Sequence, residues 1–144
     1  MTAPSRSLAL SLLPDLYAVI RFAPDAIVPP WASQGEFSSI TRTQDELSIV
    51  CPAGNIPSTY LPDIFWRALK VHGPFQFDQV GILSSLASPL ASANIGVFVI
   101  STFDTDYLLL QSKDIRNAIS TLLAAGHSVV ESNSSFNETK ENEG

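Results

Sequence analysis

The sequence predicts an α+β protein on three observations. Apolar residues recur at helical spacing in two segments, residues 78–94 and 112–126, and each segment ends in a residue suited to a helix end. Short β-branched or apolar runs lie on either side of both segments. From residue 66 to residue 131 the predicted order is strand, helix, strand, strand, helix, strand. This order is typical of the split βαβ or ferredoxin-like unit, a four-stranded antiparallel sheet with two helices on one face.

The first predicted helix begins at Asp78, which is a suitable N-cap residue. Its apolar face consists of Val80, Leu83, Leu90 and either Leu86 or Ala87. Asn94 can adopt the left-handed conformation that ends a helix. Pro89 removes one backbone hydrogen bond, so we expect it to bend the last turns without abolishing them.

A predicted hairpin separates the two helices. Residues 95–103 form a continuous apolar run, IGVFVISTF, which is typical of a strand covered on both faces or central in a sheet. The following Asp-Thr-Asp supplies turn residues, and YLLLQ is the partner strand. The strand that precedes the first helix is expected within WRALKVHGPF.

The second predicted helix has Ser112 as its N-cap and Gly126 as its C-terminal stop. Its apolar face consists of Ile115, Ile119 and Leu122. HSVVE then closes the unit as a strand.

The first half of the chain is richer in β-structure, and we expect an abbreviated version of the same unit. The predicted strands are SLALSLLP, LYAVIRF, FSSITRT and ELSIVCP, the last two joined in a hairpin around Gln44 and Asp45. The proline-rich PDAIVPPWA leaves room for at most a short helix. The expected organisation is therefore a β-rich unit over 1–62, a ferredoxin-like domain over 63–131 and a disordered polar tail over 132–144.

Composition excludes several classes of function. The 144 residues are 45% hydrophobic and carry a formal net charge of −6. Because basic residues do not cluster, we expect no nucleic-acid partner. No apolar run reaches the roughly 20 residues of a membrane helix, so we expect no membrane association and a cytoplasmic location.

The usual catalytic residues are scarce. Cys51 is the single cysteine and is predicted to be a buried thiol at a strand end. His72 and His127 have no neighbour at metal-ligand spacing and are expected to be structural or solvent-facing. We therefore predict no catalytic residue, no metal and no cofactor, and a small enzyme is the least favoured class.

The sequence leaves three interpretations of Asp104 and Asp106 open. They are solvated turn formers, or a metal-binding or catalytic carboxylate pair, or an anchor for a small cation such as the ammonium of an amino acid. The third has local support, because a helix N-terminus near Gly81 and Ile82 offers free N–H groups to a carboxylate. A zwitterion could then lie between that helix start and Asp106.

Two stretches carry a family resemblance: DQVGILSSLASPLASANIGVFVISTFDTDYLLL and, upstream, SSITRTQDELSIVCP. Over about residues 8 to 130 the chain resembles the ACT-domain family, and within it the small proteins similar to halves of the CASTOR-type cytosolic arginine sensors. The resemblance implies ferredoxin-like modules that bind amino acids between paired domains and regulate other proteins. It implies a homodimer here, with a partner copy supplying the second half of the site.

The resemblance also implies which residues bind the ligand. Thr102, Phe103 and Asp106 match positions that contact arginine, while Gly81 and Ile82 match those that wrap the α-amino and carboxylate groups. The sensors have an acidic residue where this chain has Gln79 and an aromatic residue where it has Thr105. The predicted ligand-binding set is Gln79, Gly81, Ile82, Thr102, Phe103, Thr105 and Asp106. The alternative function is a protein–protein interaction module with an unidentified protein partner and no small-molecule ligand.

Overall fold

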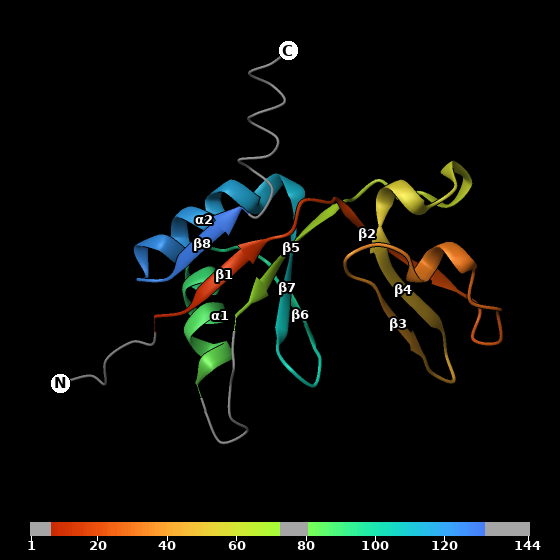
Figure 1. The fold of residues 1–144 in the computed structure, drawn as a ribbon, viewed down its shortest axis with the longest axis horizontal. Helices are drawn as coiled ribbons and strands as arrows, with labels where there is room; N and C mark the ends of the chain where they lie inside the picture. Colours follow the sequence, from red (N-terminus) through yellow and green to blue (C-terminus); the bar gives the residue numbers. More distant parts are fainter. Residues whose placement is uncertain (1–6, 73–80, 132–144) are drawn as a thin grey trace, which may run out of the picture. The chain divides into compact units, whose positions relative to one another are not determined.

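The computed structural model describes residues 7–72 and 81–131, and the chain divides into two compact units (Figure 1). Unit 1 consists of residues 1–14 and 67–144, and unit 2 of residues 15–66. The α+β class is confirmed, as is the ferredoxin-like order of elements from residue 66 onward.

Unit 1 is a sheet covered by two α-helices. Its elements are β1 (Ala9–Leu12), β5 (Trp66–Val71), α1 (Ile82–Ser92), β6 (Phe98–Ser101), β7 (Asp106–Gln111), α2 (Ile115–Ala124) and β8 (Ser128–Glu131). The strand order is β8, β1, β5, β7, β6. Strand β1 runs antiparallel to β5 and parallel to β8, and β6 and β7 form the predicted hairpin.

The position of β1 differs from the expected organisation. Residues 7–14 were expected within a first unit ending at residue 62, but β1 lies between β8 and β5 and makes the four-stranded sheet five-stranded. The reason is burial, since Leu10 and Leu12 belong to the same core as the helices. That core is made of Leu10, Leu12, Leu69, Val71, Leu86, Leu90, Ile95, Leu108, Leu110, Ile115, Ala118, Ile119 and Leu122.

Most of the predicted helix signals hold. Asn94 and Gly126 both have positive φ just beyond a helix, and Pro89 lies inside α1. Leu83 is different, because it is 37% exposed while Ile82, Leu86 and Leu90, spaced by four, are buried. The predicted helix positions Asp78 and Val80 lie outside the described residues.

The prediction of Ser112 as the N-cap of the second helix is wrong. Residues Ser112–Asp114 form a 3-10 turn, in which the Ile115 N–H donates to the Ser112 carbonyl. The α-helix starts at Ile115, three residues later, after this tighter turn.

A strand within residues 95–103 is confirmed, but the prediction that it is covered on both faces or central in the sheet is wrong. Strand β6 lies at the edge of the sheet and, within the described residues, pairs with β7 alone. Its residues Phe98, Val99 and Ile100 are half-buried. An apolar run predicts a strand, but it does not decide whether that strand lies in the middle or at the edge of its sheet.

Unit 2 is a three-stranded antiparallel sheet in the order β3 (Ser39–Arg42), β4 (Leu47–Pro52), β2 (Tyr17–Phe22). Its connections contain three short 3-10 turns, Pro30–Ser33, Ala53–Asn55 and Ser58–Tyr60, and residues 15–66 contain no α-helix. The predicted hairpin between β3 and β4 is confirmed. The core consists of Ala18, Ile20, Ala32, Leu47, Ile49, Cys51 and Ile56, so the prediction of a buried Cys51 is confirmed.

Candidate functional site

The fold brings the two halves of the predicted ligand site to one end of unit 1. Helix α1 begins after Gly81, and the turn between β6 and β7 lies at the same end of the unit (Figure 1). The sequence predicted this arrangement, because the first helix and the following hairpin share that edge in a ferredoxin-like unit.

The β6–β7 turn is held by its own threonines. The Thr102 N–H donates to the Thr105 carbonyl at 2.7 Å, and the Thr105 N–H donates to Thr102 Oγ1 at 3.2 Å. The Thr105 hydroxyl donates to the carbonyl of Val71 at the end of β5. Both threonines of the predicted set therefore shape the turn, and Thr105 also attaches it to the neighbouring strand.

Asp106 is the first residue of β7, and its side chain is half-buried. It alternates with Leu108 and Leu110, which belong to the helix-side core, so Asp106 lies on the helix-covered face of the sheet. Ser101, directly opposite in register, donates its hydroxyl to Asp106 Oδ1 at 2.6 Å. A carboxylate accepts several hydrogen bonds, so Asp106 has capacity for an ammonium or guanidinium group.

The start of α1 is open at its backbone. Gly81 has φ 84°, and a Cβ placed there would meet no atom within 4 Å. Its carbonyl accepts from the Ser85 N–H at 2.9 Å, which is the first turn of the helix. The first turn contains no acidic side chain. An anionic group is therefore the natural complement of these N–H groups.

The remaining predicted residues contribute less to this end. Phe103 is 85% exposed at the tip of the turn, and Asp104 beside it is also exposed. Gln79 lies outside the described residues. Among the three interpretations of the aspartates, the structure favours a turn role for Asp104 and separates it from the half-buried Asp106.

Comparison with known proteins identifies a domain within the chain. Residues 63–124 match the family model described as ACT domain, and residues 15–59 match a second model, of an N-terminal domain. Residues 63–124 of this chain are therefore an ACT domain. The ACT domain thus covers the region of α1 and the β6–β7 turn.

Three relatives illustrate the relationship. The cytosolic arginine sensor for mTORC1 subunit 1 of Bos taurus is 40% identical over 101 residues, which is 65% of this chain and 31% of the sensor. A protein from Agobacterium tumefaciens is 42% identical in sequence. Its crystal structure matches with a TM-score of 0.80 over 90% of this chain and 95% of that one. An aspartate kinase of Clostridium acetobutylicum shares the fold at 12% identity and a TM-score of 0.53, over 77% of this chain and 33% of the kinase. This chain spans about a third of the bovine sensor's length.

Ser101 contacts Asp106, although the predicted ligand-binding set did not include it. A four-residue turn over residues 102–105 places residue 101 directly opposite residue 106. Counting outward from the turn would therefore have identified Ser101 as the partner of Asp106.

His127 and Cys51 have structural roles. His127 is buried, its Nδ1 accepts from the Leu8 N–H at 3.1 Å, and its Nε2 lies 2.9 Å from the Ser85 carbonyl. Burial raises the pKa of the Cys51 thiol, which opposes a role as a nucleophile. Over residues 7–72 and 81–131, no group of three or more His, Cys, Asp or Glu could hold a metal ion, and no helix is long and apolar enough to cross a membrane.

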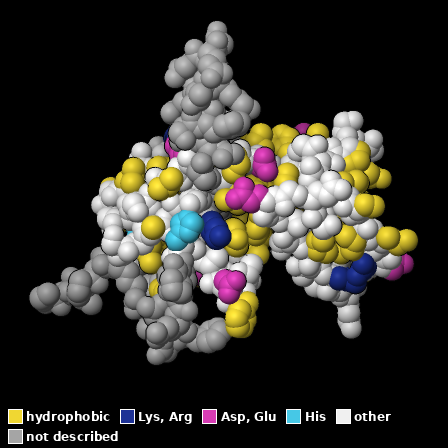
Figure 2. All heavy atoms as spheres, viewed as in Figure 1, with side chains coloured by type: hydrophobic (Ala, Val, Ile, Leu, Met, Phe, Trp, Pro, Cys, Tyr) yellow, Lys and Arg dark blue, Asp and Glu magenta, His cyan; other side chains and the backbone are white. Residues whose placement is uncertain are grey.

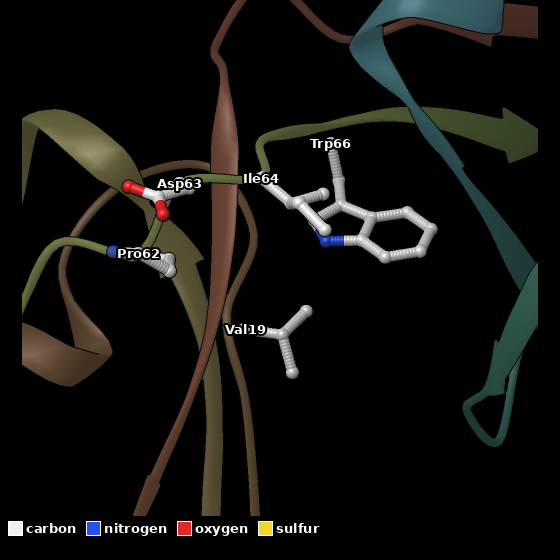
Figure 3. Close-up of a pocket in the computed structure, with 5 residues that line it drawn as sticks. All are labelled: Val19, Pro62, Asp63, Ile64 and Trp66. Carbon is white, nitrogen blue, oxygen red and sulfur yellow. The ribbon is translucent and has the colours of Figure 1, made fainter.

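Unit 2 contains a cavity of about 420 Å³ that the sequence did not indicate (Figure 3). It is lined by Val19, Pro62, Asp63, Ile64 and Trp66. Figure 3 shows the Ile64 and Trp66 side chains close together, with Val19 below them and with Pro62 and Asp63 to the left of β2 in this view. Its lining is mainly apolar, and the connection that supplies most of it has no periodic pattern.

Proposed function

We propose that the protein is a non-catalytic regulatory or sensor protein that binds a free amino acid, with the ligand at the interface of a homodimer. The observation that carries the proposal is the placement of the α1 start and the half-buried Asp106 at one end of the ACT domain. One group suits an anion and the other a cation, which matches the two charges of an amino acid.

In the proposed complex each ligand charge has its own partner. The α-carboxylate accepts from the N–H groups of the first turn of α1, and Gly81 allows close approach because it has no side chain. Asp106 accepts from the amino group or from a basic side chain, while Ser101 keeps the carboxylate in position.

The edge strand β6 supports the homodimer. Its apolar residues are half-buried, and its outer side pairs with no other described strand. A second copy that adds a strand at this edge would bury these side chains. Such a copy would also enclose the neighbouring ligand site.

Similarity to a protein named as an arginine sensor places arginine among the first ligands to test. The identity of the amino acid is otherwise open, because Gln79 and Thr105 depart from the pattern of the arginine sensors. A cytoplasmic location and an unidentified protein partner that receives the signal complete the proposal.

The test is isothermal titration calorimetry of the dimer against the common amino acids. We expect one class of amino acid to bind, and Asp106→Ala to weaken it about tenfold or more, because a charge-assisted hydrogen bond is lost. Asp104→Ala is the matched control in the same turn and is expected to bind normally. The absence of binding heat for every amino acid at millimolar concentration would refute the proposal.

A second candidate is an interaction module without a small-molecule ligand, favoured by the half-exposed apolar strand β6. In that case the dimer would have the same stability with every amino acid, and substitutions on β6 would abolish association with the partner protein.

A further inference from the structure

The sheet of unit 1 has a polar cluster on the face opposite its helices. Side chains alternate along β1 and β5, and those that face the helices are Leu10, Leu12, Leu69 and Val71. Ser11, Lys70 and His72 are the residues between and just after them. They therefore lie together on the other face.

Cross-strand pairing brings these three residues close. Ser11 is the direct partner of Lys70 in the antiparallel register, and the His72 N–H donates to the Ala9 carbonyl at 2.9 Å, which continues the pairing by one step. The Ser11 hydroxyl and His72 Nε2 are in hydrogen-bond contact. Figure 2 shows a histidine and a basic side chain side by side on this exposed surface, over β1 and β5.

Lys70 differs from the other basic side chains of the described residues. Each of those has a polar partner: Arg21 with Glu46, Arg42 with Pro24 and Ala26, Arg67 with Leu13, Lys113 with Asp114, and Arg116 with Glu131. Within residues 7–72 and 81–131, the Lys70 side chain makes no hydrogen bond or ion pair. Lys70 as a residue is half-buried, and its ammonium, which has no partner among the described residues of a chain of net charge −6, is available to a ligand.

We propose that Lys70, His72 and Ser11 form a binding site for the phosphoryl group of a small phosphate ester or of free phosphate. The ammonium has three donors. When His72 carries its proton on Nε2 and donates to Ser11 Oγ, the Ser11 hydroxyl proton is available to the ligand. Lys70 and Ser11 then donate to the ligand from two adjacent strands, while His72 orients the Ser11 hydroxyl. Four donated protons, three from the ammonium and one from the hydroxyl, suit the several oxygens of a phosphoryl group, and lysine binds phosphate as a point charge.

This site is separate from the proposed amino-acid site. Asp106 lies on the helix-covered face of the sheet, whereas Lys70 and Ser11 lie on the opposite face. The two proposals can therefore fail independently.

The test is an NMR titration of the full chain with inorganic phosphate at constant ionic strength, with chloride as the balancing anion. We expect saturable shifts at the Ser11 and His72 amides. Lys70→Gln should weaken binding about tenfold or more, because it removes the charge-assisted hydrogen bonds, while Lys70→Arg should largely retain it. Lys113→Gln is the matched control, since it removes one positive charge from unit 1 at a lysine that already has a partner.

Two further ligands, glycerol phosphate and acetate, define the chemical class of the ligand. Glycerol phosphate should bind at least as well as free phosphate if an ester is the natural ligand, and weaker binding of the ester would assign the site to free phosphate. Acetate should bind more weakly than either. The proposal is overturned if the shifts rise linearly without saturation, if Lys113→Gln weakens binding as much as Lys70→Gln, or if acetate binds as tightly as phosphate. The spectrum of each folded variant shows whether its substitution left the sheet intact.

Discussion

The cores of the two units are covered by different kinds of secondary structure. Among the residues that the structure describes, the core cluster of unit 1 has thirteen members between a sheet and two α-helices, whereas that of unit 2 has seven members under connections that contain 3-10 turns and prolines. An aromatic group covers part of the smaller core: Phe22 meets Tyr60 edge-on at 5.3 Å between ring centroids, and Trp31 stacks on Tyr60 at 6.3 Å. Proline-rich loops and aromatic side chains thus cover the core of unit 2, whereas α-helices cover the core of unit 1.

This difference decides where a charged ligand can bind. A helix start provides several N–H groups that point the same way, and α1 provides them beside a carboxylate. The 3-10 turns of unit 2 are three or four residues long and provide no comparable terminus. The amino-acid function is therefore proposed for the ACT domain, while unit 2 contributes a mainly apolar cavity.

Matched truncations test the difference between the cores. Leu86→Ala in unit 1 and Leu47→Ala in unit 2 remove the same atoms from fully buried sites. Both should lower the free energy of unfolding, within the roughly 2 to 5 kcal/mol seen for such changes. We expect Leu86→Ala to cost more, because helices packed on a sheet collapse around a cavity less readily than loops do. Urea denaturation measures both, and a larger cost at Leu47 would reverse the comparison.

Glycine substitutions probe the loops of unit 2 more locally. Gly35 has φ 104°, and a Cβ there would lie 2.8 Å from Pro52 Cγ, so Gly35→Ala should cost about 2 kcal/mol. Gly54 has open space and no positive φ, so Gly54→Ala should change stability by less than about 0.5 kcal/mol. Gly126→Ala in unit 1 has the φ strain without the clash and should fall between them. An equal loss of stability in Gly35→Ala and Gly126→Ala would show that the contact with Pro52 adds nothing to the φ strain.

Cys51 is expected to make the stability of unit 2 depend on pH in the alkaline range. Burial raises the pKa of its thiol above the ordinary 9.0, so the folded state holds its proton longer than the unfolded state does. This contribution is fully present below pH 9.0 and is lost as the pH rises above it, by about 1.4 kcal/mol per pH unit until the folded thiol also ionises. Stability measured from pH 8 to pH 10 should therefore fall more steeply than in Cys51→Ala. Parallel curves would show that the thiol is exposed to solvent.

The same contrast shows how far the sequence predicts the structure. In unit 1 the helices were predictable because their ends and faces have local signals, such as Asn94, Gly126 and the spacing of Ile115, Ile119 and Leu122. The place of β1 was not, because the alternation of Leu10 and Leu12 fits a strand of any sheet. Its pairing with β8, more than a hundred residues away, depends on the shared core.

The candidate sites also differ in whether the sequence predicts them. The turn at Asp106 and the glycine at α1 have sequence signals, since both are local backbone features. The cavity of unit 2 depends on Val19 meeting residues more than forty positions later, which no local pattern encodes.

The smallest expected effect concerns a surface ion pair of unit 1. Arg116 Nη1 lies 2.7 Å from Glu131 Oε2, and this hydrogen bond raises the pKa of the guanidinium. The two side chains are 70% and 34% exposed, so water and salt screen their attraction. A double-mutant cycle with Arg116→Ala and Glu131→Ala should give a coupling of about 0.5 kcal/mol that decreases in high salt. A coupling free energy as large as the loss of stability in Leu86→Ala would mean that the ion pair with β8 holds α2 in position. The helix-covered core alone would then not be enough to stabilise unit 1.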